Sequence, residues 1–158
     1  SLRQAITVNA DGAQHDDEHV EIHHHHGHTY SDLVMNSACG GSSHFIGTGL
    51  LTIAEGANKT DASQVFRNLL LSEKARAEAI PELEVLADDV SAAHGAASAP
   101  VDSEQMHYLM SRGLNPKDAQ SMIVSGFLND SFSNLTNTTL IEEMRTRLTV
   151  HLECELKR

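Results

Sequence analysis

Short apolar segments separated by turn-forming residues fill the N-terminal part of the chain. Residues 6–8 lead into an Asn-Ala-Asp-Gly turn, residues 50–53 lead into a Glu-Gly-Ala-Asn turn, and residues 83–86 form the last such segment. Residues 20–22 alternate between apolar and polar side chains, which is the period of a strand. This pattern predicts an all-β architecture for the region.

The spacing of these segments narrows the choice among all-β folds. Their centres recur irregularly, at roughly 10 to 15 residues, which is typical of a solenoid with several strands per coil or of a sandwich. Asn-Gly pairs, which mark tight hairpins, are missing from the sequence, and this favours a parallel β-helix. Intrinsic propensity instead predicts a helix over residues 64–79, which are rich in Ala, Leu and charged side chains.

The pattern becomes helical in the last third of the chain. Asp102 or Ser103 can cap a first helix, and Gly113 provides its end. Asn115 is the expected N-cap of a second helix with Pro116 at its first position. The first two predicted helices therefore each have an N-terminal capping residue in the sequence.

A third helix is expected over residues 140–156. The three helices carry apolar side chains at helical spacing, namely Met106, Leu109, Met110, Ala119, Met122, Ile123, Phe127, Leu140, Ile141, Met144, Leu148 and Leu152. We therefore divide the chain into a β region, residues 1–99, and a small helical domain, residues 100–158. The methionines also suit an adaptable docking surface, although such stripes are most often core.

Composition and charge exclude several classes of partner. The 158 residues are 40% hydrophobic and 21% charged, with a net charge of −11 when histidine is neutral. The absence of a basic patch argues against nucleic acid and anionic membranes as partners. No apolar run in the sequence approaches the length of a membrane span.

The two cysteines indicate a reducing compartment. Cys39 and Cys154 are far apart in the sequence, so a disulfide framework is not expected and we predict a cytoplasmic protein. Each is more simply a buried or incidental thiol than a ligand. The chain lacks an initiator Met and opens on the strand-like residues 5–8, which indicates a fragment of a longer protein. No phosphate-binding Gly-x-x-x-x-Gly-Lys motif is present in the sequence, so any ATP hydrolysis belongs to a partner.

Several motifs in order resemble one protein family. Residues 81–96 are similar to a signature of a proline, an acidic strand, Asp-Asp-Val and Ser-His-Gly-Ala-Thr, and residues 108–114 are similar to the Phe-Tyr-Leu-x-Ser-Arg-Gly element that follows it. Residues 28–33 and 68–77 fit as well. These motifs resemble the SufB/SufD family of scaffolds for iron–sulfur cluster assembly. Phe66 stands where SufB types carry a cysteine essential for assembly, so the SufD type is the better match.

The resemblance implies a fold and a set of partners. It implies a right-handed parallel β-helix with a small C-terminal α-helical domain, so that residues 64–79 belong to the β-helix. It also implies a cytosolic complex in which a SufC-type ABC ATPase docks on the helices, and a SufB-type paralogue or a second copy of the chain pairs at the β-helix. A transient iron–sulfur cluster is assembled at that interface. Such a subunit is a scaffold and not an enzyme.

His94 is the residue that the resemblance places at the cluster. Imidazole suits iron and can replace cysteine in iron–sulfur centres. Ala92 and Ala97 stand where the family often has a cysteine and a threonine, which leaves the histidine without these neighbours. The alternative from the residues alone is a turn histidine that bonds to the backbone. The acids near it, which are exposed strand-end residues or oxygen donors for iron, are Glu84, Asp88 and Asp89.

The histidine tract at residues 23–28 suggests a second kind of site. On a strand His24, His26 and His28 would share one face, and such a row can bind zinc, nickel or iron. The alternative function is therefore a histidine-rich metal-binding protein, while architectural or adventitious roles for the tract stay open. A β-helix enzyme acting on acidic polysaccharide is a further alternative, which the scarcity of basic residues in the β region disfavours.

Overall fold

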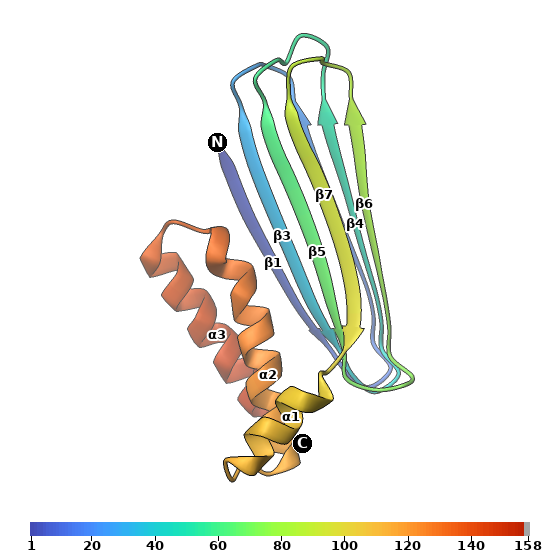
Figure 1. The fold of residues 1–158 in the computed structure, drawn as a ribbon, viewed down its shortest axis with the longest axis vertical. Coiled ribbons are helices and arrows are strands. Elements are labelled where there is room, and N and C mark those ends of the chain that lie inside the picture. The colour runs from blue at the N-terminus through green and yellow to red at the C-terminus, as the bar shows by residue number, and fades with distance from the viewer. Residues whose placement is uncertain (157–158) are drawn as a thin grey trace.

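The computed structural model describes residues 1–156, with side chains to Leu152, and contains a stack of strands followed by helices (Figure 1). Along the chain the elements are β1 (Leu2–Ala10), β2 (His15–His24), β3 (Tyr30–Cys39), β4 (His44–Ile53), β5 (Asp61–Leu70), β6 (Arg76–Val85), β7 (Ser91–Pro100), α1 (Ser103–Ser111), α2 (Pro116–Asp130), the 3-10 helix η1 (Ser131–Asn134) and α3 (Thr138–Leu156). Within the described residues no helix is long and apolar enough to cross a membrane.

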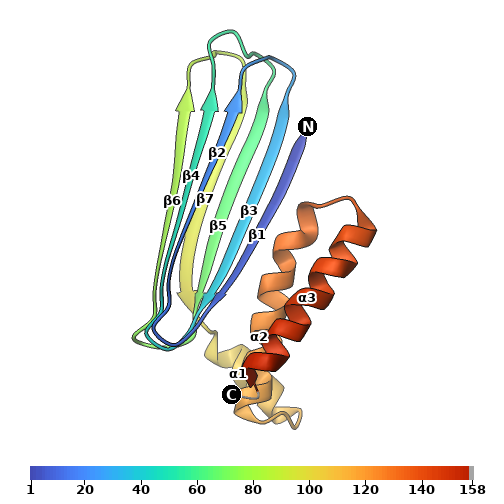
Figure 2. The same cartoon turned by 180° about the vertical axis from the view of Figure 1, so that it is seen from behind.

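The strands form two parallel sheets that face each other. Odd-numbered strands make sheet A in the order β1-β3-β5-β7, and even-numbered strands make sheet B in the order β2-β4-β6 (Figure 2). The register climbs the stack one coil at a time, because Ala5 pairs with Val34, Val34 with Val65, and Val65 with Gly95. Each coil thus contributes one strand to each sheet. The predicted parallel β-helix with C-terminal helices is confirmed.

Residues 64–79 form the end of β5, a turn and the start of β6, so the helix predicted from propensity is wrong. In β5 the side chains of Gln64, Phe66 and Asn68 are buried while alternate neighbours are less so, which is the period of a strand and not of a helix. The hydroxyl of Ser72 accepts a hydrogen bond of 3.1 Å from the backbone of Ala75 and fixes the turn. Pairing with β3 and β7 satisfies the backbone of β5 and overrides local propensity.

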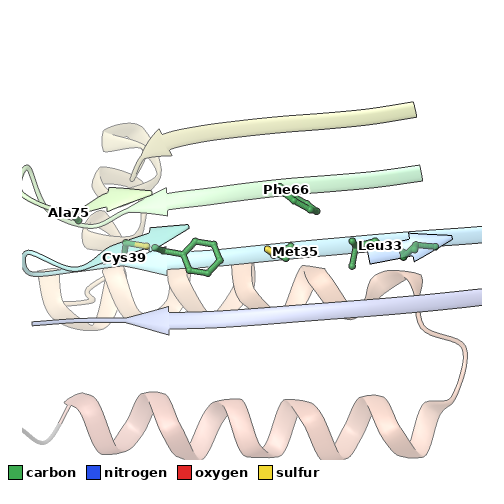
Figure 3. Packing of buried hydrophobic residues seen from close by; sticks show 7 residues of the cluster. Leu33, Met35, Cys39, Phe66 and Ala75 are labelled. Carbon is green, nitrogen blue, oxygen red and sulfur yellow. The ribbon is translucent and has the colours of Figure 1, made fainter. Parts of the chain in front are cut away.

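The core between the sheets contains the rings of Phe45 and Phe66, together with aliphatic and polar side chains. Phe66 packs with Leu33 and Met35 in one buried cluster (Figure 3). Gly47 and Gly49 of β4 leave the room that these side chains occupy, because a Cβ at Gly47 would lie 2.7 Å from the Sδ of Met35 and a Cβ at Gly49 would clash with the ring of Phe66. Core packing of this density tolerates little added volume.

The caps of the first two helices follow the sequence. The Asp102 carboxylate accepts a hydrogen bond of 2.8 Å from the backbone N–H of Glu104, and the Asn115 side chain accepts one of 2.9 Å from that of Asp118. Pro116 occupies the first turn of α2, as predicted. Asp102, and not Ser103, is therefore the cap of α1.

Helix α2 packs on the outer face of sheet A. Its buried side chains are Ala119, Val124 and Leu128, and the cluster that contains Val124 and Leu128 includes Ala38 of β3. Met122, which the sequence places in the apolar stripe, is 54% exposed. The predicted stripe is correct for Ala119, which is buried, and for Ile123 and Phe127, which pack against this cluster. It was wrong for Met122, and it omitted Val124 and Leu128, which face the sheet.

Polar contacts fix the position of the helices on sheet A. The Asn36 side chain donates to the carbonyl of Phe127 at 2.8 Å. The Asn134 side chain donates to the carbonyls of Gln4 and Asp32, both at 3.1 Å. These bonds join residues far apart in the sequence, so the end of α2 and η1 are fastened to the first coils.

Candidate functional site

The last coil of the β-helix has an open end. Strand β7 is the last strand of sheet A and β6 is the last strand of sheet B, so within the described residues no further strand pairs with their outer edges (Figure 1). An edge strand presents unpaired backbone N–H and C=O groups. This end of the stack is therefore a surface on which another chain can pair.

His94 projects from β7 on the interior side of the coil. It pairs with Gln64, which pairs with Leu33, and both of these partners are buried at 1% exposure. Residues in register on parallel strands share a face, and the hydrogen bond of 3.0 Å from the Asn68 side chain to its partner Ser98 shows that this holds for β5 and β7. His94 thus continues an interior row, but its ring is exposed because no coil covers it.

The strand around His94 carries small side chains. Along β7 the residues on either side of His94 that share its face are Ala92 and Ala96. The rest of the strand is Ser, Ala, Gly and Pro. Below His94 the amide of Gln64 donates to the carbonyl of Glu82 at 2.8 Å, which closes the interior with a polar contact. His94 is therefore the one side chain of β7 that offers a strong metal ligand.

The acidic residues near the signature do not join His94. Glu84 pairs with Thr52 on the outer face of sheet B, and Asp89 forms an ion pair with Lys59. Among the described residues no group of three or more His, Cys, Asp or Glu side chains surrounds one metal position. Any cluster at His94 therefore needs ligands from outside the described part of this chain.

The histidine tract does not form the expected row. Strand β2 ends at His24, and the backbone turns, with a φ of 57° at His28. The prediction that His24, His26 and His28 share one strand face is wrong for this reason.

His24 lies inside the coil, whereas the other two histidines are exposed. Its Nδ1 lies 2.7 Å from the Thr29 hydroxyl and its Nε2 lies 2.8 Å from the Ser31 hydroxyl. Both ring nitrogens are thus hydrogen-bonded, and burial lowers the pKa of His24 below its ordinary value.

A second histidine group lies on the outer face of β2 and was missed from the sequence. The Nε2 of His19 is 3.0 Å from one carboxylate oxygen of Glu21, and the Nε2 of His23 is 3.1 Å from the other. Hydrogen bonds from His19 and then His23 lower the pKa of the Glu21 carboxyl. The signal was the alternation of histidine and acid at every second position, which begins at His15 and Asp17.

The thiol of Cys39 is an interior group. It is fully buried, and burial raises its pKa, which opposes formation of the reactive thiolate. Its Sγ lies 3.7 Å from the Ser37 hydroxyl. The side chain of Cys154 lies outside the described residues.

Helices α1 and α2 expose apolar side chains. Tyr108 and Met110 of α1 are 58% and 41% exposed, and Met122 of α2 is 54% exposed. Helix α1 has no buried residue. A groove between the end of β7 and the two helices is lined in part by Met122, Ile123 and Phe127. Tyr108 and Ile123 line one shallow hollow, and Met122 and Ile123 line the groove next to it. The surface formed by Tyr108, Met122 and Ile123 is called the helical apolar surface below.

Comparison with known proteins identifies the family. Residues 4–127 match the family model "SUF system FeS cluster assembly, SufBD core domain". The chain is 33% identical over 132 residues to the iron–sulfur cluster assembly protein SufD of Escherichia coli (strain K12), covering 84% of this chain and 31% of that protein. It is 39% identical over 116 residues to SufD of Bacillus subtilis (strain 168), covering 73% and 26%.

A third relative is an iron–sulfur cluster assembly SufBD family protein of Synechocystis, which is 31% identical over 141 residues, covering 89% of this chain and 31% of the relative. The chain thus spans about a third of the length of these relatives or less. Strands β2 to β7 and helix α1 fall within the matched residues 4–127, which also cover most of β1 and α2. The chain belongs to the SufB/SufD family.

Proposed function

We propose that this chain is the C-terminal part of a SufD-type scaffold subunit for iron–sulfur cluster assembly, with His94 as a ligand at the assembly interface. The observation that carries the proposal is the position of His94, alone among small residues at the open end of the coil stack. The relatives named as SufD and SufBD family proteins support the role in cluster assembly. The subunit acts as a cytoplasmic scaffold without turnover of its own.

The open end of the stack suits a partner of the same architecture. The free edges of β6 and β7 can hydrogen-bond to strands of another β-helix. The small side chains of β7 let a second chain approach closely. We therefore assign this surface to a SufB-type paralogue or a second copy of the chain.

His94 supplies one ligand and the partner supplies others. Among the described residues its ring has no hydrogen-bond partner, so a nitrogen lone pair is available without breaking a contact. Imidazole binds iron, and histidine replaces cysteine in some iron–sulfur centres. A single histidine cannot hold a cluster, so the transient cluster forms only when the partner is present. Iron and sulfide are cargo in this scheme.

The helical apolar surface is the proposed docking site for a SufC-type ABC ATPase. Exposed aromatic and methionine side chains are common at adaptable interfaces. Tyr108 and Met122 lie on different helices and are each more than half exposed. ATP hydrolysis belongs to that partner.

Co-purification with a SufC-type ATPase tests the docking site. The double variant Tyr108→Asp and Met122→Asp is expected to lose ATPase retention, because it places two charges at the centre of the proposed interface. Leu140→Asp is the control, since Leu140 is 46% exposed in the first turn of α3 and does not line the hollows that define the helical apolar surface. Retention of the ATPase by the double variant would reject this surface.

Reconstitution with ferrous iron, sulfide and a SufB-type partner tests His94. His94→Ala is expected to lose the visible absorption of the cluster while the complex still forms. His26→Ala is the control, because His26 is an exposed histidine in the turn after β2. An unchanged cluster yield with His94→Ala rules out the ligand role.

A further inference from the structure

The outer face of β2 carries a row of histidines and acids that the proposed function does not use. At alternate positions this face presents His19, Glu21 and His23, all exposed. Glu21 lies between the two rings, with its oxygens 3.0 Å and 3.1 Å from the Nε2 atoms of His19 and His23. The ring of His25 stacks beside that of His23, with centroids 6.1 Å apart. Three imidazoles and one carboxylate thus gather along one line.

This donor set has the chemistry of a transition-metal site. Two imidazoles and one carboxylate are the protein ligands of many zinc and ferrous sites. Along the strand Glu21 lies about 7 Å from each histidine at the Cα atoms, and the two histidines lie about 13 Å apart. Both rings nevertheless lean toward Glu21 and already reach its carboxylate. A metal ion that takes the place of the proton between an Nε2 atom and a Glu21 oxygen has a nitrogen donor and an oxygen donor next to each other.

We propose that His19, Glu21 and His23 bind one divalent first-row transition-metal ion, of the zinc or ferrous class. The three side chains do not surround one point in the structure, because each Nε2 faces its own carboxylate oxygen across a hydrogen bond. Binding moves the imidazole proton to Nδ1, which frees the Nε2 lone pair, and requires rotation of exposed side chains only. Remaining coordination positions are open to water.

The site is separate from His94 and from the even-numbered histidines. It lies on the outer face of sheet B at its first strand, whereas His94 lies on the last strand of sheet A. His24 is buried with both ring nitrogens bonded to hydroxyls and faces the interior. The strand geometry therefore points to the odd-numbered histidines, and the inference stands whether or not His94 binds a cluster.

A second histidine pair on the same sheet gives the competing location. The rings of His15 and His44 lie edge to face at 4.9 Å, and the Nε2 of His44 is 2.8 Å from a Glu78 oxygen. This group contains two imidazoles and a carboxylate from three strands. The experiment must distinguish it from the site on β2.

Titration of the chain with zinc chloride, followed by calorimetry, tests the proposal, and cobalt(II) chloride gives a visible spectrum of the coordination sphere. Glu21→Gln, which keeps the shape of the side chain, and the pair His19→Ala with His23→Ala are each expected to weaken zinc binding about tenfold or more, since even outer partners of a metal site contribute that much. The control pairs are His26→Ala with His28→Ala and His15→Ala with His44→Ala. Circular dichroism checks that each variant is folded.

The outcomes separate clearly. Loss of affinity and of the cobalt spectrum only in the variants of β2 supports the site. Unchanged zinc affinity in those variants overturns it, and an equal loss in either control pair assigns binding to the turn or to the neighbouring histidine pair and overturns it as well. Cluster reconstitution at His94 is a separate assay, so its result does not alter this one.

Discussion

His24 lies inside the coil with both ring nitrogens hydrogen-bonded, and its replacement by phenylalanine tests how far this contact stabilises the fold. The substitution keeps a ring of similar size at the end of β2. It removes the bonds of 2.7 Å to Thr29 and 2.8 Å to Ser31. The Thr29 hydroxyl still has the Thr60 hydroxyl at 3.0 Å and a backbone carbonyl as partners, whereas the buried Ser31 hydroxyl loses its ring partner.

The expected cost follows from these two bonds. Each contributes about 1 kcal/mol net, and leaving a buried hydroxyl without a partner costs about 1–3 kcal/mol, part of which the more apolar ring offsets. We therefore expect His24→Phe to lower the free energy of unfolding by about 1–2 kcal/mol at neutral pH. Unfolding in urea, followed by circular dichroism, measures this value.

The pH dependence gives the sharper test. The pKa of His24 in the folded chain lies below its ordinary value of 6.5, because burial disfavours the charged ring. The stability that the neutral ring provides is complete above pH 6.5 and falls as the pH drops toward the folded pKa, at up to about 1.4 kcal/mol per pH unit. The phenylalanine variant lacks this proton-binding site, so the wild-type advantage should shrink between pH 7 and pH 5.5. Parallel stability profiles of the two proteins over that interval would refute the reasoning.

The remaining predictions concern packing and capping. Phe66→Ala is expected to destabilise the chain by about 3–5 kcal/mol in urea, because the ring is fully buried between the sheets, whereas Tyr108→Ala, with the ring 58% exposed, should change stability by less than about 0.5 kcal/mol. Asn115→Ala should cost about 1 kcal/mol through loss of the cap on α2, and Asn115→Asp, which retains the acceptor, should cost less. A cost for Asn115→Ala equal to that of Phe66→Ala would show that the cap does more than close the helix.

The starts of the first two helices were predictable because their signals are local. The carboxylate of Asp102 and the Asn115–Pro116 pair act within one turn, and each occupies its expected place. Residues 64–79 were misread by propensity because a strand of a solenoid is held by the coils on either side of it. Buried polar residues such as Gln64 also hide the alternation that marks a strand.

The sequence could not show which histidine side chains of β2 point into the coil and which point outward. The interior of this coil holds polar side chains, among them His24, Ser31 and Asn68, so polarity does not tell which face is outside. Which histidines share a face depends on where β2 ends. If the strand continued for two more residues, His26 would lie on the same face as His24. The resemblance to the family identified His94 as a candidate, but only the register with Gln64 places it on the interior row.

The interior side chains become smaller toward the open end, and this change leaves the imidazole of His94 exposed on the last coil. One row reads Met35, Phe66 and Ala96 from coil to coil, so the large buried side chains give way to a methyl group on β7. An end coil with Leu or Phe at these positions would expose an apolar patch and a free strand edge together, which favours aggregation. Small residues avoid that patch, and they leave the imidazole of His94 as the projecting donor in the row that runs from Gln4 through Leu33 and Gln64. The small side chains of β7 that avoid an apolar patch at the end of the stack therefore also leave His94 exposed.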